Sequence, residues 1–434
     1  MTTRTTPPRP LDITAVFPEL APLARTAVRL HPRAGAPTAA GSSVGGPLLW
    51  PAEEPWPTCP EHAGPWQRGV APDDVHVGRR VLREAWARPR AEGADLLTEE
   101  ERALVDRGTE PHRTALDGPV PLVPVAQIRA ADVPALPRPE GTDLLQVLWC
   151  AFDHPEDDYS PRVELRWRRA ADVVPPLAAP PRPAVIGNDD YLPEPCVLHP
   201  ETVTEYPAPH ELPEELADRI HAWEEGEEGI EGEDEEPGVC YQYDLAVAPG
   251  WKLGGHAPWS FSDPFPMACA ECGAGVRPLL TIDGTEWDGG SGSWAPVEDA
   301  GYTGYHFLGP ALETQITIGR GYSLQVYVCE ASGARARESR ARCEPAVNPP
   351  CLRGRAGAAL ASATAGRERW ASSDRSTTAE EVDSCRMSER AGRRLRRTSS
   401  TWPGWSRPTT RCTPIRPTPP SGSRSAPRDT ADRP

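Results

Sequence analysis

The chain has 434 residues, of which 54 are proline and only 38% are hydrophobic, and its formal net charge is -17. This length predicts one or two domains, and the low apolar fraction indicates that part of the chain lies outside any core. A strongly acidic protein repels phosphate, which argues against nucleic acids and anionic membranes as its partners.

The two ends of the sequence give no sign of a membrane or secretion signal. No apolar run approaches the ~20 residues that are needed to span a bilayer. The N-terminus, M-T-T-R-T-T-P-P-R-P, lacks the charged-then-apolar pattern of a signal peptide. We therefore expect a cytoplasmic protein, in which the eleven cysteines act as metal ligands or buried thiols rather than as disulfides.

Residues 1–29 are predicted to form an N-terminal arm with a short amphipathic helix, whose apolar spacing extends over Pro18–Leu30. A Gly/Ala/Pro loop follows and leads to Gly45-Gly46, where we expect a tight turn or a close backbone approach. Trp50 and further tryptophans then alternate with prolines, either as buried packing or as an exposed recognition surface.

The strongest helical pattern covers Val81–Arg107, and Pro89 and Gly93 are expected to split it. Thr98 and Glu101 have the spacing of a capping box, which predicts a helix start at this point. A second short helix is predicted over Leu212–Trp223. Strands are predicted over Pro119–Ile128, Leu144–Phe152, Val163–Trp167, Val239–Val247, Pro278–Ile282, Gln315–Ile318 and Tyr322–Cys329.

One pattern occurs twice in the chain. The first copy extends over about 42–154 and the second over about 251–330. A proline-rich connector (170–237) that ends in an acidic loop separates them, and we expect it to lie over the core. The recurrence predicts an internal duplication. The matching positions are Gly45, Gly46, Trp50, Cys59, His62, Gln146 and Cys150 with Gly254, Gly255, Trp259, Cys269, Cys272, Gln325 and Cys329.

The repeated cysteines have spacings that suit zinc. Cys59-x2-His62 and Cys150-x3-His154 supply four donors in the first copy. The second copy offers Cys269-x2-Cys272 and Cys329, but Gly333 stands where the first copy has its last histidine. Two structural zinc sites, the second lacking one ligand, are one interpretation. Small buried residues at equivalent core positions are the other.

The sequence contains no G-x-S-x-G, H-E-x-x-H or dinucleotide-binding motif. Asp283, Glu286 and Asp288 surround a tryptophan and could frame the carboxylate pocket of a hydrolase-like enzyme, or they could be solvated surface groups. Lys252 is the only lysine, and we expect it to be an isolated surface residue. Cys196 and Cys240 match nothing in the repeat and are interpreted as core residues.

From residue 331 onward the composition changes abruptly. The segment 331–434 has 21 arginines, no lysine and 10 acidic residues, so the acidic excess lies entirely before it. Such a composition cannot bury enough apolar surface to fold. A basic arm for nucleic acid and a product of a shifted reading frame both account for it, and the abrupt change within a motif favours the second.

Taken together, G-G-x-x-x-W at Gly254–Trp259, C-A-E-C followed by R-P-L-L-T-I, and S-L-Q-V-Y-V-C at Ser323–Cys329 resemble the YwqG-like domain family of bacteria. The resemblance covers 30–330 and implies a β-rich α+β fold of two related halves with no established activity. Tryptophan-rich loops and missing catalytic motifs favour a non-enzymatic binding or protein-interaction module with an unknown protein partner.

Overall fold

The computed structural model describes most of the chain before residue 332, and all of the described residues belong to one compact unit, Met1–Arg369. The basic tail predicted from residue 331 lies outside the described residues, apart from residue 331 and Ala341–Cys343. Most of the predicted acidic loop also lies outside them. The described residues are 4–91, 93–157, 159–227, 238–259, 264, 267–269, 272–302, 304, 308–319, 321–331 and 341–343.

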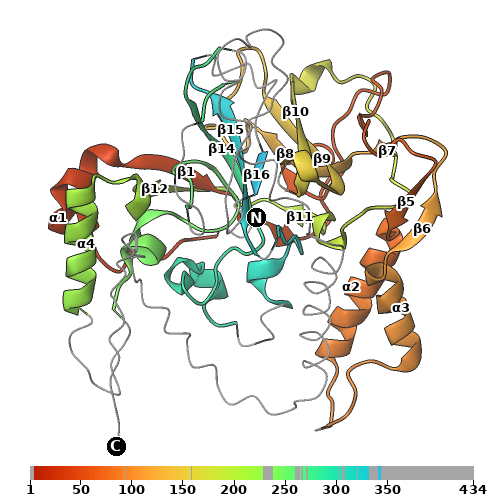
Figure 1. The fold of residues 1–434 in the computed structure, drawn as a ribbon, viewed down its shortest axis with the longest axis horizontal. Coiled ribbons are helices and arrows are strands. Elements are labelled where there is room, and N and C mark those ends of the chain that lie inside the picture. Colours follow the sequence, from red (N-terminus) through yellow and green to blue (C-terminus); the bar gives the residue numbers. More distant parts are fainter. Residues whose placement is uncertain are drawn as a thin grey trace, which may run out of the picture. The chain divides into compact units, whose positions relative to one another are not determined.

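The fold is mixed α+β and is built on two antiparallel sheets of six strands each (Figure 1). The first sheet has the order β12-β1-β13-β14-β15-β16, and two of its strands, β14 and β15, are the apolar runs that the sequence predicts near residues 280 and 325. Its strands are β12 (Glu201–Glu205), β1 (Arg25–Arg29), β13 (Lys252–Gly254), β14 (Val276–Asp283), β15 (Ser323–Cys329) and β16 (Ala341–Cys343).

The second sheet has the order β10-β9-β8-β3-β11-β2, and its long strands are the apolar runs predicted near residues 125 and 148. Two pairs of short strands, β4 with β7 and β5 with β6, extend beside it. The strands outside the first sheet are β2 (Arg33–Ala34), β3 (Ser43–Val44), β4 (Thr58–Cys59), β5 (Trp66–Gly69), β6 (His112–Ala115), β7 (Val120–Pro121), β8 (Val123–Arg129), β9 (Leu144–His154), β10 (Ser160–Arg168) and β11 (Cys196–Val197).

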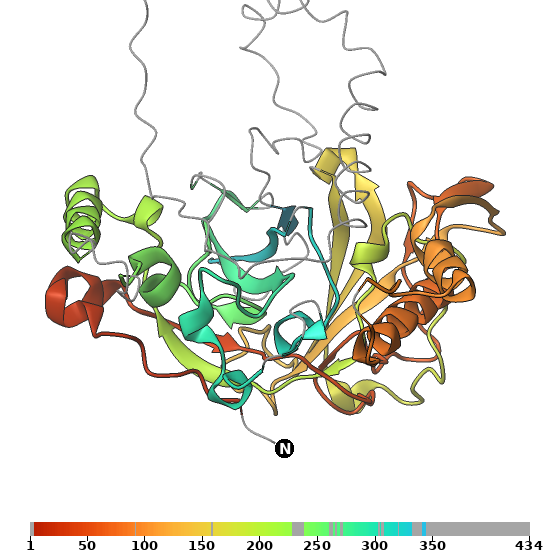
Figure 2. The same ribbon diagram turned by 90° about the horizontal axis from the view of Figure 1, so that it is seen from below.

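Two pairs of helices lie on opposite sides of the sheets in both views (Figures 1 and 2). Thr98 caps α3 and exchanges hydrogen bonds with Glu101, as the sequence predicts. Phe17 and Trp223 hold the other pair together edge to face, with ring centroids 6.1 Å apart. The helices are α1 (Ile13–Val16), α2 (Pro72–Ala87), α3 (Glu99–Thr109) and α4 (Glu214–Glu227).

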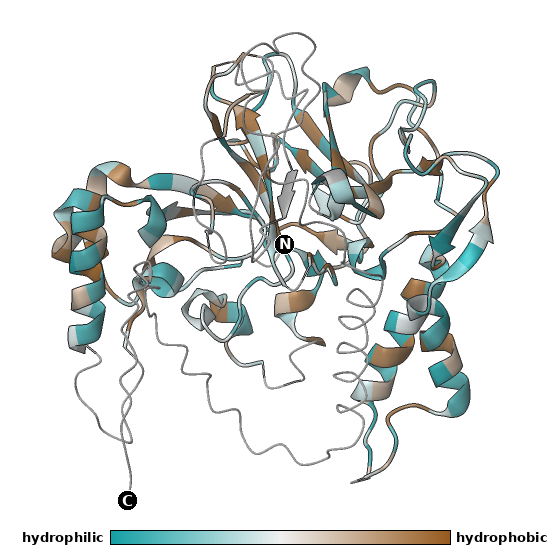
Figure 3. Ribbon diagram, viewed as in Figure 1, coloured by the Kyte–Doolittle hydropathy of each residue, from teal (hydrophilic) through white to brown (hydrophobic). Residues whose placement is uncertain are grey.

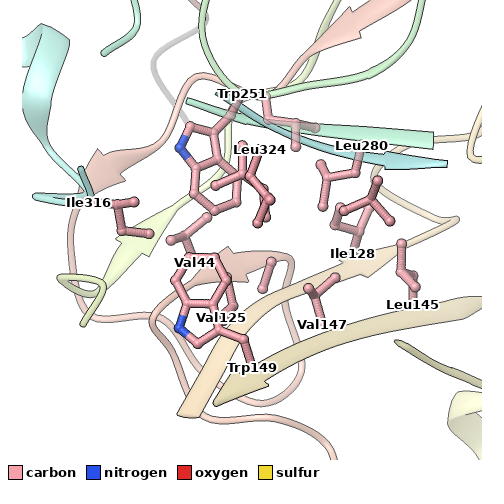
Figure 4. Packing of buried hydrophobic residues seen from close by; sticks show 14 of the residues in the cluster. Val44, Val125, Ile128, Leu145, Val147, Trp149, Trp251, Leu280, Ile316 and Leu324 are labelled. Atoms are coloured by element: carbon pink, nitrogen blue, oxygen red, sulfur yellow. The ribbon is translucent and has the colours of Figure 1, made fainter. Parts of the chain in front are cut away.

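The main core lies between the two sheets (Figure 4). Leu280 and Leu324 lie in strands of the first sheet, and Trp251 immediately precedes β13 of that sheet. These side chains face Val125 and Trp149 of the second sheet, and all five are buried. Apolar residues concentrate in these strands, whereas the helices are mostly hydrophilic on their outer faces (Figure 3). Of the predicted ligands, Cys329 ends β15, whereas Cys150 lies four residues before the end of β9.

One pair of strands in each sheet has a matching register. Gln146 of β9 lies opposite Gln127 of β8, and Gln325 of β15 lies opposite Thr281 of β14. In each strand pair the register shifts just after a proline. The proline is Pro124 in β8, three residues before Gln127, and Pro278 in β14, three residues before Thr281. A bulge at the same position makes both strand pairs bend alike.

The chain crosses twice between the sheets, each time at the tripeptide Leu-His-Pro. Leu30–Pro32 connects β1 of the first sheet to β2 of the second, and Leu198–Pro200 connects β11 of the second sheet to β12 of the first. His31 has φ 43 at its crossing, a left-handed conformation that non-glycine residues seldom adopt.

Four sequence predictions of elements are wrong. The helix predicted over Pro18–Leu30 gives way to the 3-10 helix Pro18–Leu23 and then strand β1, because pairing with two distant strands outweighs local spacing. Val239–Val247 contains a π-helical turn at Tyr241–Ala246 instead of a strand. Gln315–Ile318 provides only an isolated bridge at Ile318, and the connector supplies β11 and β12 rather than lying over the core.

Candidate metal centre

Cys59 and His62 come from one turn. Cys59 ends β4, which pairs with β7 and thereby places the thiol against the end of the second sheet. His62 follows three residues later, and its ring stacks on Phe152 with the centroids 4.3 Å apart. The short spacing between the two residues therefore lets a single turn present a sulfur and a nitrogen to the same point.

Cys150 and His154 come from β9. Side chains alternate along a strand, so these two residues and Phe152 between them share one face. Cys150 and His154 are both completely buried, although the strand ends at His154. The other two donors thus lie on a rigid element that is about ninety residues away in the sequence.

The structure brings all four predicted ligands together, with their donor atoms within 4.8 Å of one another. Cys59 Sγ is 3.2 Å from His62 Nδ1 and 3.4 Å from His154 Nε2, and Cys150 Sγ is 3.4 Å from His62 Nδ1. In a tetrahedral zinc site with ordinary Zn–S and Zn–N bonds, a sulfur and a nitrogen ligand lie about 3.5 Å apart. The cluster is therefore already close to the size that such an ion requires, and it could hold a metal ion.

The surroundings fix the orientation of His154. Its Nδ1–H donates to the carbonyl oxygen of Phe152 over 2.9 Å, which leaves Nε2 with its lone pair directed at Cys59. Glu61 lies 3.9 Å from the same nitrogen and pairs with Arg162. A histidine held by its second nitrogen in this way is typical of metal ligands.

The two thiols affect each other's ionisation. The hydrogen bond from Cys150, assisted by His154 and His62, lowers the pKa of the Cys59 thiol. The neighbouring Cys59 sulfur and burial raise the pKa of the Cys150 thiol. Two adjacent thiolates are thus unfavourable without a cation, and a bound dication would stabilise both.

A cavity of about 350 Å³ adjoins the cluster, and Cys59, Cys150 and Arg162 are among its lining residues. The cavity provides a path by which an ion could reach the buried donors. The remaining lining residues are Thr58, Pro60, Leu122, Val163, Glu164, Leu165 and Arg166.

The predicted ligands of the second copy also come together. The sulfur atoms of Cys269, Cys272 and Cys329 lie within 4.8 Å of one another, and the last two are 3.4 Å apart. Within the described residues this cluster has three donors rather than four. Cys196 is buried and Cys240 half-buried, and neither joins a cluster.

The three carboxylates proposed for a hydrolase make separate contacts. Glu286 is buried, accepts a hydrogen bond from the Trp251 backbone over 3.0 Å and lies 3.2 Å from His31. Asp288 accepts from the backbone and side chain of Ser291, and Asp283 accepts from the Thr285 backbone. These contacts favour structural roles, and none of the three residues lines the cavity beside the first cluster.

The expectation of a surface lysine is wrong, because Lys252 is completely buried and pairs with Glu205 over 2.6 Å. The close backbone approach predicted at Gly45-Gly46 is confirmed, because Gly45 has φ +62 and a Cβ there would lie 2.8 Å from the Glu194 carbonyl oxygen. A close approach also occurs at Gly255, in the second copy. Gly255 has φ +70, and a Cβ there would lie 2.2 Å from Glu205 Oε2. The buried ion pair therefore explains why this position has no side chain.

Sequence reasoning missed His31. Its ring is completely buried between Glu201, 3.3 Å from Nε2, and Glu286, 3.2 Å from Nδ1. Arg29, also buried, donates to the carbonyl oxygen of Glu286 over 3.2 Å. The repeated Leu-His-Pro tripeptide was the available signal, since it marks both crossings between the sheets.

No known family model matches the chain, and no curated protein matches it. Among the described helices, none has the length and apolar character that crossing a membrane requires.

Proposed function

We propose that the protein is a non-enzymatic binding module whose first half is held together by a structural zinc ion. The observation that carries the proposal is the convergence of Cys59, His62, Cys150 and His154 at zinc-sized separations. A closed site with four protein ligands leaves no open position for a substrate, which favours a structural role over a catalytic one.

The zinc ion would link the turn that carries Cys59 and His62 to strand β9. The turn that carries Cys59 belongs to a two-stranded sheet, and a small buried cluster that includes Trp50 and Val120 packs this region against Cys150 and Phe152 of β9. A metal link between them would therefore stabilise the loop-rich region around Trp50 and Trp56, whose rings lie 4.9 Å apart. Because zinc binds only the folded arrangement, its binding free energy would add to folding stability.

The binding role rests on what this region presents to solvent. Trp66 is 46% exposed, and the guanidinium of Arg113 lies 3.9 Å above its ring. Trp50 is buried and Trp56 half-buried, so only part of the tryptophan-rich segment is core. An exposed aromatic ring beside an arginine is the kind of group that anchors protein partners. The partner stays unidentified.

Elemental analysis of the purified protein tests the proposal. We expect one zinc per chain, lost in Cys59→Ser and kept in Cys196→Ser, which alters a buried cysteine outside both clusters. A metal-free wild-type protein would overturn the zinc assignment. Turnover in a broad hydrolase-substrate screen that Asp283→Asn abolishes would instead support the alternative enzyme.

We also propose that the two sheets arose from one duplicated segment, as in the YwqG-like family that the sequence resembles. The matching bulges after Pro124 and Pro278 support this, as do the equal registers of Gln146 and Gln325. In this proposal the halves exchange strands. β1 inserts beside β13 of the other half and β11 beside β3, each followed by Leu-His-Pro.

A further inference from the structure

The second sulfur cluster is assembled from a turn and a strand end. The backbone carbonyl of Cys269 accepts a hydrogen bond from the Gly273 amide over 2.8 Å. The backbone amide of Cys269 donates to the Ala274 carbonyl over 2.7 Å. Gly273 has φ 72, a conformation that closes the turn immediately after Cys272. Cys329 ends β15, and its sulfur completes the group.

This cluster differs from the first in both donor type and donor number. All three donors are sulfur, whereas the first cluster has two sulfurs and two nitrogens. His154 stands four residues after Cys150, and the residue four positions after Cys329 is Gly333, which has no side-chain donor. No other histidine, cysteine or carboxylate in the described part of the chain joins the three thiols.

We propose that Cys269, Cys272 and Cys329 bind a soft, low-coordinate metal ion, Cu(I), rather than zinc. Thiolates suit Cu(I) as well as zinc, so the number of donors decides between the two ions. Structural zinc takes four ligands, so three donors leave it incomplete. Cu(I) is satisfied by three sulfur ligands. This inference does not depend on the zinc proposal, because the clusters share no residue.

The position of the cluster makes the ion exchangeable. Cys269 and Cys329 are 8% and 5% exposed, while Cys272 is exposed. A competing thiol can therefore approach from the side of Cys272 and take the metal. The site is suited to accepting and releasing Cu(I) rather than to holding a permanent structural ion.

Anaerobic titration of the reduced, full-length protein tests the proposal, with Cu(I) supplied against a chromogenic chelator. Cys272→Ser alters the exposed ligand and so has the smallest effect on folding, and Cys240→Ser is the matched control. We expect Cys272→Ser to bind one Cu(I) fewer per chain than wild type and to lose ultraviolet thiolate-to-copper absorption. Cys240→Ser should bind as wild type does. Comparison of variants cancels any binding by the cysteines after residue 331.

Two results would overturn the proposal. One is equal Cu(I) binding by wild type and Cys272→Ser. The other is a second zinc in the purified protein that Cys272→Ser removes and stoichiometric Cu(I) does not displace. Zinc content measured in Cys59→Ser separates this outcome from failure of the first site, since that variant leaves the three-thiol cluster intact.

Discussion

Lys252 donates a 2.6 Å hydrogen bond to Glu205, and both side chains are completely buried. Glu205 also accepts from the backbone amides of Ala248 and His256, and Lys252 donates to the His256 carbonyl. The pair joins β12 to β13 across β1, which lies between them. The only lysine of the chain therefore serves to hold the edge of the first sheet.

We predict that Lys252→Met will destabilise the protein by about 3–5 kcal/mol, because it leaves a buried carboxylate without its cation. Lys252→Met combined with Glu205→Gln should cost less than the sum of the single changes. Guanidinium unfolding of the three variants measures the coupling. Strictly additive costs would show that the two groups act independently.

We predict that Gly255→Ala will cost about 1–3 kcal/mol, since the residue has a left-handed backbone and borders a carboxylate. The added Cβ would lie 2.2 Å from Glu205 Oε2 and 2.8 Å from the Ala27 Cβ. Gly226→Ala in α4 is the matched control, because no atom lies within 4 Å of the position its Cβ would take. Thermal unfolding compares them, and equal melting temperatures would contradict the prediction.

Acid should destabilise the protein through the carboxylates around His31. Burial raises the pKa of Glu286, but hydrogen bonding and charge from His31, with Arg29, hold it below its ordinary value of 4.5. A lowered folded-state pKa means that this stabilisation is complete above pH 4.5 and is lost as the pH falls through the folded value.

The Glu286→Gln variant tests this dependence. We expect its stability to be lower than wild type at pH 7 and to fall less steeply below pH 4.5, as followed by urea unfolding across pH. Glu140→Gln, at an exposed position, should retain the wild-type slope. An unchanged slope in Glu286→Gln would rule out this carboxylate as a source of acid sensitivity.

Removal of the proposed zinc should loosen the first half selectively. We predict that a strong chelator will lower the melting temperature of wild type by several degrees, as expected for loss of about 2 kcal/mol or more from a folding-linked ligand. Cys150→Ser should start at the lower temperature and not respond. Cys196→Ser should respond as wild type does, and a chelator effect that persists in Cys150→Ser would place the metal elsewhere.

The sequence predicted what depends on local patterns. The strand-like runs that the sequence analysis places at Pro119–Ile128, Leu144–Phe152, Pro278–Ile282 and Tyr322–Cys329 specified β8, β9, β14 and β15. The short ligand spacings and their recurrence identified both sulfur clusters. These patterns can be recognised in the sequence because they depend only on residues that are neighbours within one strand or turn.

What depends on distant pairing was not predicted. β1 has a helix-like spacing, and only its pairing with β12 and β13 makes it a strand. Burial of Lys252 requires Glu205, which is 47 residues away in the sequence, and the site around His31 requires Glu201, which is 170 residues away. No local window contains these partners.

Burial raises the pKa of Asp283 to about 7, although the Thr285 amide opposes the change. Its folded state therefore binds more protons than the unfolded chain between the ordinary value of 3.8 and about 7, so stability falls as pH rises through this window. Asp283→Asn removes the ionisation and should stabilise the protein by about 1–2 kcal/mol at pH 8 and little at pH 5. Urea unfolding at the two pH values measures the difference. An equal gain in unfolding free energy at the two pH values would mean that the Asp283 carboxylate is not neutral in the folded protein. A loss of stability at pH 8 would mean that the charge of the carboxylate is needed there, as the hydrolase alternative requires.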